Sequence, residues 1–420
     1  MKRSKKVEWT RLDNAAKIFP PTSNEKDTKV FRVACELYER VDPVLLQEAL
    51  DETIEIYPLY KYVLRKGVFW YYFETGSLRP LVEEESLPVC ARIYQEGKKN
   101  LLFRVLYYKN RISLEVFHAL TDGTGAIWFL KSLLSRYLLK KYSDKLSGLN
   151  LKIDYDASVS QKKDDSFLKY YTGKRMSLTA KIQKAYHIKG NRKEENRMQL
   201  VEGTMSVKSV LSAAHEYNTT LTVYLTALFL YSIYKTMPER KKKYPVVLTV
   251  PVNLRNYFES VSARNFFGTI LIGYHFEKNN STKLSDVIKS VAESFSRELT
   301  QERLGNHMEK LAALEHNVFA RVVPLAVKDV TLRIANFLNE RGITAALSNV
   351  GKITMPTEFA PYIKQFDFFT SARRPQICVC SYEDTLTVSF TSPYTETDIQ
   401  KYFFKMLTDK GIDVVIASNQ

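Results

Sequence analysis

Cysteine is scarce in this sequence, and its distribution argues against disulfide bonds and metal binding. The 420 residues include four cysteines, namely Cys35, Cys90, Cys378 and Cys380. Four are too few for a disulfide framework in a chain of this length. Cys378 and Cys380 alternate along a predicted strand, without the spacing or the partners of a zinc site. We therefore expect buried free thiols in a reducing compartment, and no metal site.

Long hydrophobic runs are also absent. The segment Met1–Lys6 is basic, but no apolar segment follows it, so the sequence predicts no secretory signal. The longest apolar run, Leu221–Tyr234, is interrupted by Thr222, Thr226 and Ser232. It is also shorter than the ~20 residues that a membrane-spanning helix needs. We therefore expect a cytoplasmic protein without a transmembrane segment.

Acidic residues are the minority among the charged ones, since 62 Lys and Arg outnumber 46 Asp and Glu and give a net charge of +16. Much of this excess lies in Gln161–Arg197. The chain has no recognisable nucleic-acid-binding motif, so we do not expect a nucleic-acid partner. The basic segment is either a solvated face or linker, or a site that recruits an anion such as a phosphorylated co-substrate or an acidic carrier protein.

The length of the chain predicts two domains, because a single core rarely grows beyond ~250–300 residues. Strands and helices alternate along most of the sequence, which indicates an α/β protein. From Tyr142 to about Glu202 the periodicity weakens and the charge rises. We therefore predict an N-terminal unit over residues 1–175, a crossover over about 143–200, and a C-terminal unit over 200–420.

Shorter patterns predict three further elements. The runs Tyr60–Leu64 and Val68–Phe73 predict a hairpin that turns at Arg65-Lys66-Gly67. Pro245–Val250 predicts a short buried strand that ends at Pro251. Leu325–Asn339 has the apolar spacing of a helix.

The most informative stretch is Phe117–Gly123. It follows two β-prone runs, Leu101–Tyr108 and Ile112–Phe117, which predict a hairpin, and it precedes a helical pattern over Ala126–Leu139. His118 therefore lies at the tip of a strand, and Asp122 lies where a turn becomes a helix. Strand ends hold side chains rigidly and leave them accessible.

A histidine in this place is a candidate general base. Its unperturbed pKa lets it accept a proton near neutral pH, provided that it is accessible and oriented. Asp122 would either hydrogen-bond the imidazole or brace the turn by pairing with a cation. Gly123 and Gly125 leave room for the close approach of a substrate or of neighbouring backbone. Residue types alone also allow an ordinary surface histidine in a hairpin-to-helix turn.

Other candidates compete poorly. The remaining histidines have no metal-binding spacing and suit packing or surface roles: His187, His215, His275, His307 and His316. The triplet Asp154-Tyr155-Asp156 has the DxD form used by metal-dependent glycosyltransferases, but no phosphate-binding glycine loop accompanies it. Neither a P-loop nor a GxSxG nucleophile elbow is present.

The chain repeats one order of elements. A second predicted hairpin turns at Glu383-Asp384, leads to Thr391-Ser392-Pro393 and is followed by a helical pattern, as the first leads to His118. An internal duplication is one interpretation, although any hairpin with one buried face shows the same alternation.

His118–Gly123 resembles the HxxxDG motif of the acyltransferase superfamily. This superfamily includes chloramphenicol acetyltransferase, plant BAHD-type acyltransferases, wax-ester synthases and peptide-synthetase condensation domains. Three further stretches are similar to its motifs in the expected order, namely Val250–Arg255, Arg264–Gly268 and Leu347–Gly351. The opening Trp9–Asp13 resembles the start of stand-alone alcohol O-acetyltransferases.

The resemblance implies an α/β fold of two chloramphenicol acetyltransferase-like subdomains, with mixed sheets, flanking helices and an active-site channel between them. His118 would deprotonate an acceptor for attack on an acyl thioester, while Asp122, in the catalytic motif, would mainly be structural and pair with Arg255. The resemblance also implies possible oxyanion or substrate contacts at Ser348, Asn349 and Gly123. The co-substrate would be acyl-CoA or an acyl carrier protein, with no tightly bound cofactor, and the acceptor a small molecule, an alcohol rather than an amine.

Several features separate this chain from individual branches of the superfamily. Phe117 precedes His118, where many condensation domains have a second histidine, and the DFGWG motif of BAHD enzymes is missing. Thr222-Val223-Tyr224 stands where wax-ester synthases have Asn-Asp. Two alternatives therefore stay open: a non-catalytic binding module of this fold, or a condensation-type enzyme that forms amides or esters with a carrier protein. Arg255 could also be a surface salt bridge, and Ser348-Asn349 a simple strand-ending turn.

Overall fold

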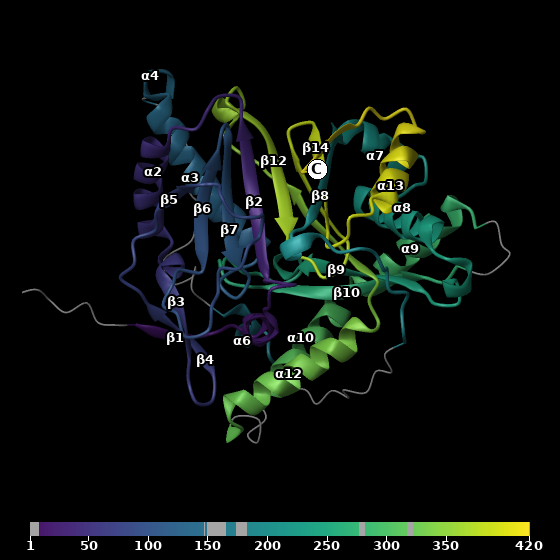
Figure 1. Ribbon diagram of the computed structural model, residues 1–420, viewed down its shortest axis with the longest axis horizontal. Coiled ribbons are helices and arrows are strands. Elements are labelled where there is room, and N and C mark those ends of the chain that lie inside the picture. The colour runs from purple at the N-terminus through teal and green to yellow at the C-terminus, as the bar shows by residue number, and fades with distance from the viewer. Residues whose placement is uncertain are drawn as a thin grey trace, which may run out of the picture.

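The computed structural model describes residues 8–146, 148, 165–173, 183–276, 282–316 and 322–419. The triplet Asp154–Asp156 and residues 161–164 and 174–182 of the basic segment lie outside the described residues. The described strands form three sheets, and the two larger ones lie side by side near the middle of the molecule (Figure 1).

A five-stranded sheet carries the histidine motif. Its strand order is β12-β2-β7-β6-β5. Four of its strands come from the first half of the chain: β2 (Val30–Leu37), β5 (Val82–Glu84), β6 (Phe103–Tyr108) and β7 (Arg111–Phe117). Helices α2 (Pro43–Ile56) and α3 (Gly123–Lys141) pack against each other on its outer side (Figure 1). Asp42 begins α2 by accepting hydrogen bonds from the backbone N–H groups of Val44 and Leu45. Strands β6 and β7 and helix α3 confirm the predicted hairpin and helix on either side of His118.

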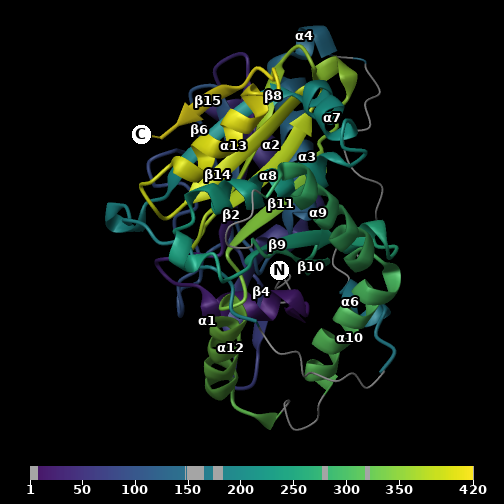
Figure 2. The ribbon, with the colours of Figure 1, turned by 90° about the vertical axis from the view of Figure 1, so that its right-hand side faces the viewer.

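A seven-stranded mixed sheet forms the second half, with the order β10-β9-β11-β13-β14-β8-β15. Strand β11 runs parallel to both of its neighbours, and the other pairs are antiparallel. The bounds of its strands are β8 Gln199–Ser206, β9 Val246–Asn253, β10 Phe267–Tyr274, β11 Ala345–Lys352, β13 Gln376–Tyr382, β14 Thr385–Ser392 and β15 Val415–Ser418. Helices α8 (Leu221–Thr236), α9 (Leu284–Glu298) and α13 (Asp398–Thr408) cover one side of it (Figures 1 and 2).

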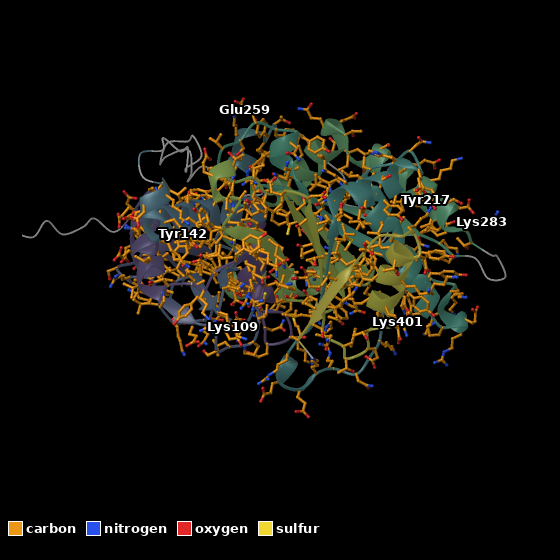
Figure 3. The ribbon with its side chains drawn as sticks, turned by 90° about the horizontal axis from the view of Figure 1, so that it is seen from above. Lys109, Tyr142, Tyr217, Glu259, Lys283 and Lys401 are labelled. Carbon is orange, nitrogen blue, oxygen red and sulfur yellow. The ribbon has the colours of Figure 1, made fainter. Side chains whose placement is uncertain are left out.

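One strand crosses between the halves. Strand β12 (Ile363–Thr370) comes late in the chain but pairs with β2 in the first sheet, from Ile363 opposite Leu37 to Thr370 opposite Phe31. It also packs against β13 and β14 of the second sheet. The first sheet is therefore completed by the second half of the chain, and its hydrophobic core includes Cys378, Cys380 and Tyr382 of β13. Figure 3 shows side chains packed across the width of the molecule.

The two halves share one arrangement. In the first, β2 pairs with the second strand of the β6–β7 hairpin, and α3 follows that hairpin. In the second, β8 pairs with the second strand of the β13–β14 hairpin, and α13 follows. Both hairpins turn at a residue with positive φ, Lys109 at 52° and Glu383 at 49°. This order supports an internal duplication in which only the first copy presents a histidine.

The structure corrects three sequence-based predictions. The hairpin of β3 (Tyr62–Lys66) and β4 (Tyr71–Thr75) turns later than predicted, because the Gly67 N–H donates to the Trp70 carbonyl oxygen. Strand β9 continues through Pro251, which has a strand partner only on the β10 side, where proline is tolerated. Ser348 and Asn349 lie inside β11 and not in a terminal turn.

The remaining elements complete the chain. Strand β1 pairs with β4 to give the small third sheet, β1-β4-β3. The other bounds are β1 Trp9–Arg11, α1 Phe19–Thr22, α4 Ser143–Leu146, α6 Ser166–Lys169, α7 Val207–His215, α10 Gln301–His316 and α12 Leu325–Glu340. The four cysteines are buried free thiols. Within the described ranges, no helix combines the length and the apolar character that a membrane span requires.

Candidate functional site

His118 is held where β7 ends and meets the start of β2. Its backbone N–H donates to the Lys29 carbonyl oxygen at 2.8 Å. Its ring stacks on Phe19 of α1, with 4.4 Å between ring centroids, and meets Phe31 edge-on at 5.0 Å. The Phe267 ring of β10 lies 5.3 Å away. An aromatic pocket from both halves of the chain therefore fixes the plane of the imidazole.

Asn265 sets the tautomer of this imidazole. Its side-chain N–H groups face two acceptors, the Asp13 carboxylate at 3.3 Å and the Ala119 carbonyl oxygen at 3.4 Å. Its Oδ1 is therefore the atom that faces His118 Nδ1, at 3.1 Å. Because Oδ1 can only accept, Nδ1 must carry the proton and donate it. Nε2 is then the unprotonated nitrogen of the neutral ring.

Burial lowers the pKa of His118 below its ordinary value of 6.5. A hydrogen bond to its own backbone, the Asp122 charge and the Asn265 contact oppose this shift, and the charge of Lys29 adds to it. The ring is therefore neutral at neutral pH, which is the state that a general base requires.

The network continues to the start of the chain. Asp13 is completely buried and accepts hydrogen bonds from the Ala16 backbone N–H and the Asn265 side chain. Its carboxylate lies 3.5 Å from Arg264 Nε. Burial raises the pKa of Asp13 to about 6, although the Arg264 charge opposes the shift. Asp13 thus holds the amide that holds the histidine.

Replacing Asn265 with alanine tests this positioning role. We expect kcat to fall ~10–100-fold with little change in KM, because the ring loses the partner that orients it for the chemical step. Histidine NMR signals should report the change directly, since the variant loses the preference for a protonated Nδ1. An Asn265→Ala enzyme with unchanged kcat and an unchanged tautomer would contradict the assignment.

Asp122 faces the second half of the chain. Its Oδ1 accepts from the Gly125 N–H at the start of α3, at 3.0 Å. Its Oδ2 accepts from the Phe266 N–H at 2.8 Å and pairs with Arg255 Nη1 at 2.7 Å. One carboxylate therefore begins the helix and joins it to the segment after β9. The structure brings together Asp122 and Arg255, as the resemblance implies.

The side chain of Arg255 is buried and does not lie on the surface. Its side chain and that of Asp122 are each 6% exposed. Besides Asp122, the guanidinium donates to the carbonyl oxygens of Ser262, Arg264 and Phe266, at 2.9, 2.6 and 3.3 Å. These bonds shape the loop that presents Asn265. The alternative of a surface salt bridge is therefore wrong.

Gly123 and Gly125 both lie against other parts of the protein. A Cβ on Gly125 would collide with Thr121 Oγ1 and the Ala263 carbonyl oxygen, two atoms that are already hydrogen-bonded to each other. A Cβ on Gly123 would lie 3.3 Å from the Phe368 ring of β12. The sequence allows two reasons for a glycine at position 125, the close approach of a substrate or of neighbouring backbone. The contact with the Ala263 carbonyl oxygen supports the second reason.

The hydrogen bonds of Asn349, next to Ser348, are separate from the network around His118 and Asp122. The Asn349 amide donates to Thr222 Oγ1 at 2.7 Å, and its Oδ1 accepts from the Gly351 N–H at 2.9 Å. These bonds hold a bulge in β11 where Gly351 adopts a φ of 85°. Among the described residues, no hydrogen bond joins either side chain to His118. An oxyanion role for them stays a prediction.

Sequence reasoning missed three residues that orient His118: Phe19, Asp13 and Asn265. The stretches Trp9–Asp13 and Arg264–Gly268 both resemble superfamily motifs, so the sequence marks the positions of Asp13 and Asn265. It does not reveal their roles, because the contacts join segments about 250 residues apart in the chain.

A cavity of about 340 Å³ lies beside α1. It is lined by residues 21–24, by Arg333, Asn336 and Phe337 of α12, and by Arg373. Arg333 Nε donates to the Pro21 carbonyl oxygen at 2.7 Å, and Arg373 pairs with Glu340. Two guanidinium groups therefore face a hollow that begins two residues after Phe19. In the part of the chain that the structure describes, no three His, Cys, Asp or Glu side chains are placed to hold a metal ion.

Solved structures with this fold include acyltransferases and condensation domains. The trichothecene 15-O-acetyltransferase TRI3 of Fusarium sporotrichioides aligns with a TM-score of 0.63 at 11% identity, over 97% of this chain and 96% of that one. TRI101 of the same fungus, complexed with coenzyme A and T-2, gives 0.64 at 11%, over 97% and 99%. The first condensation domain of the calcium-dependent antibiotic synthetase gives 0.63 at 13%, over 97% and 99%. The predicted α/β fold class is thus confirmed.

Sequence comparison adds the family. No curated protein matches the chain. The family model described as alcohol acetyltransferase matches residues 102–383, which include the histidine motif, Asn265 and both sheets' central strands. The chain therefore belongs to the alcohol acetyltransferase family.

Proposed function

We propose that this protein transfers an acyl group from the thioester of CoA to the hydroxyl group of a small molecule, with His118 as the general base. The observation that carries the proposal is the hydrogen bond from His118 Nδ1 to Asn265, which leaves Nε2 unprotonated. The lowered pKa of His118 supports it, because the ring is neutral at neutral pH. Membership of the alcohol acetyltransferase family supports a hydroxyl acceptor.

The chemical step follows from this geometry. Nε2 of His118 takes the proton of the acceptor hydroxyl while the oxygen attacks the thioester carbonyl. The tetrahedral intermediate then collapses, the C–S bond breaks, and the imidazolium returns the proton to the leaving thiolate. This direct transfer uses no enzyme nucleophile. Ser348 and Asn349 are our candidates for contacts to the oxyanion, a role that can contribute ~3 kcal/mol.

The cavity beside α1 is our candidate for the phosphate end of the donor. Arg333 and Arg373 line it, and a guanidinium group binds phosphate through paired N–H donors. The same short helix, α1, borders the cavity at Pro21 and reaches His118 at Phe19. A long flexible donor could therefore hold its phosphates here and its thioester at the histidine. Coenzyme A is present in the TRI101 complexes of similar fold.

Thiol release measured with a matrix of donors and acceptors tests the function. We expect release from acyl-CoA only when an alcohol is present, and slower release with the matching amine. An acyl-N-acetylcysteamine thioester, which has no phosphates, should react with a higher KM. Release with amines alone would favour amide formation, and release only from a carrier-bound thioester would favour a condensation-type enzyme. If no combination released thiol, a non-catalytic binding module would be the better description.

A further inference from the structure

Helix α12 is amphipathic, but its apolar stripe faces solvent and its polar side faces the protein. Its solvent-facing side carries a stripe of apolar residues at helical spacing, which we name the outer face: Val327, Val330, Ile334 and Leu338. They are 54, 52, 55 and 42% exposed. A helix of a soluble protein ordinarily buries such a stripe in the core. This helix leaves it uncovered among the described residues.

The polar side of α12 is the side that contacts the protein. Asp329, only 4% exposed, accepts a hydrogen bond from Tyr71 Oη at 2.9 Å. Lys328 Nζ donates to the Phe69 carbonyl oxygen at 2.8 Å, and Arg333 Nε donates to that of Pro21. These bonds hold the helix in one orientation. The exposure of the outer face is therefore set by specific polar contacts.

A second apolar feature lies at the same end of the molecule. The turn between β3 and β4, which we name the hairpin tip, exposes Val68, Phe69 and Trp70 by 73, 39 and 43%. It is joined to α12 by a bond from the Leu325 N–H to the Val68 carbonyl oxygen at 2.8 Å. Figures 1 and 2 show α12 and β4 together at the end of the molecule farthest from α4. The hairpin tip thus lies beside the first turn of α12, at the same end of the molecule as the outer face.

Basic side chains border these two apolar features. The Arg11 guanidinium lies over the Trp70 ring at 5.2 Å. Arg333 is exposed along one side of α12. The whole chain carries a net charge of +16, which attracts it to anionic surfaces. An apolar ridge with a tryptophan beside it and basic groups around it matches the requirements of an anionic membrane interface.

We propose that the outer face of α12 and the hairpin tip insert into the headgroup region of an anionic lipid bilayer. A helical ridge and a neighbouring loop tip can enter a flat interface together, whereas a helix-binding groove would accept only one of them. Docking in this way would put the α1 side of the molecule, which carries Phe19, close to the bilayer. Lipophilic acceptors dissolved in the membrane would then be near the site.

Flotation of the full-length protein with lipid vesicles tests the proposal. We expect the wild-type protein to float with phosphatidylcholine vesicles that contain about 30% phosphatidylglycerol, and much less with phosphatidylcholine alone. Val330→Gln/Ile334→Gln should reduce the partition coefficient at least about tenfold, because it removes apolar area without adding charge. Fluorescence of Trp70, isolated by comparison with Trp70→Phe, should shift to the blue on binding.

Matched variants come from exposed apolar residues on other helices. Val44 on α2 is 66% exposed and Tyr402 on α13 is 42% exposed, so Val44→Gln and Tyr402→Gln should float like the wild type. A wild type that did not float, or a double variant that floated equally well, would overturn the proposal. So would a wild-type dimer, seen by sedimentation and abolished by the double variant, without vesicle binding. Thiol release with a water-soluble acceptor should be unchanged in the double variant, which separates this test from that of the catalytic function.

Discussion

Replacing His118 with alanine should lower the rate of acyl transfer at least ~10³-fold without unfolding the protein. The ring is the group placed to take the proton, since Asn265 occupies Nδ1 and leaves Nε2 for the acceptor. The measurement is acceptor-dependent thiol release at saturating donor, with a thermal melt of the same sample. Retained turnover would remove His118 from the mechanism, whatever its position.

The pH dependence of the wild-type enzyme provides a second measurement of the same residue. Neutral imidazole is the active form, and it is lost as the pH falls through the pKa of His118. Because burial lowers that pKa, the activity should hold at pH 6.5, the ordinary value for histidine, and decline only below it. A decline centred above 6.5 would mean that the neighbouring carboxylates outweigh burial.

Removing one partner of the buried Asp122–Arg255 pair should cost ~3–5 kcal/mol of unfolding free energy. Asp122→Asn leaves the Arg255 guanidinium buried without its counter-charge, and Arg255→Gln leaves the carboxylate in the same state. Activity should fall as well, because both residues fix the turn after His118. Chemical denaturation with a fluorescence readout gives the free energy.

An exposed pair in the same chain provides the control. Asp51 and Arg79 also form an ion pair, but their side chains are 37 and 63% exposed. Asp51→Asn should therefore change the free energy of unfolding far less than Asp122→Asn does, because water screens an exposed pair. Equal changes in the free energy of unfolding for the two substitutions would show that the buried pair stabilises the protein no more than an exposed pair does.

The part of the site around His118 is predictable from sequence because its features lie close together along the chain. The alternation of β6 and β7, the glycines and the helical spacing of α3 lie within about forty residues around His118, so periodicity alone places the histidine at a strand end. The Asp122–Arg255 pair needs the family resemblance, because 133 residues separate the two.

The partners of His118 are not predictable in the same way. Asp13 acts through Asn265, and Phe19 acts by stacking, so each role depends on how distant segments meet. Helix α12 shows a related limit. Its spacing predicts a helix correctly, but periodicity cannot tell which face meets the protein, and here the polar bonds of Asp329 and Arg333 turn the polar face inward.

The crossing of β12 also bears on how the polypeptide reaches its native state. The edge of β2 is covered only when residues 363–370 are available to pair with it. During synthesis, more than two hundred residues must follow β7 before that edge is closed, and until then β2 presents unpaired backbone groups that can recruit other strands. A fragment that stops near residue 175 would keep that exposed edge permanently. Both halves must therefore be present before the pocket around His118 is complete.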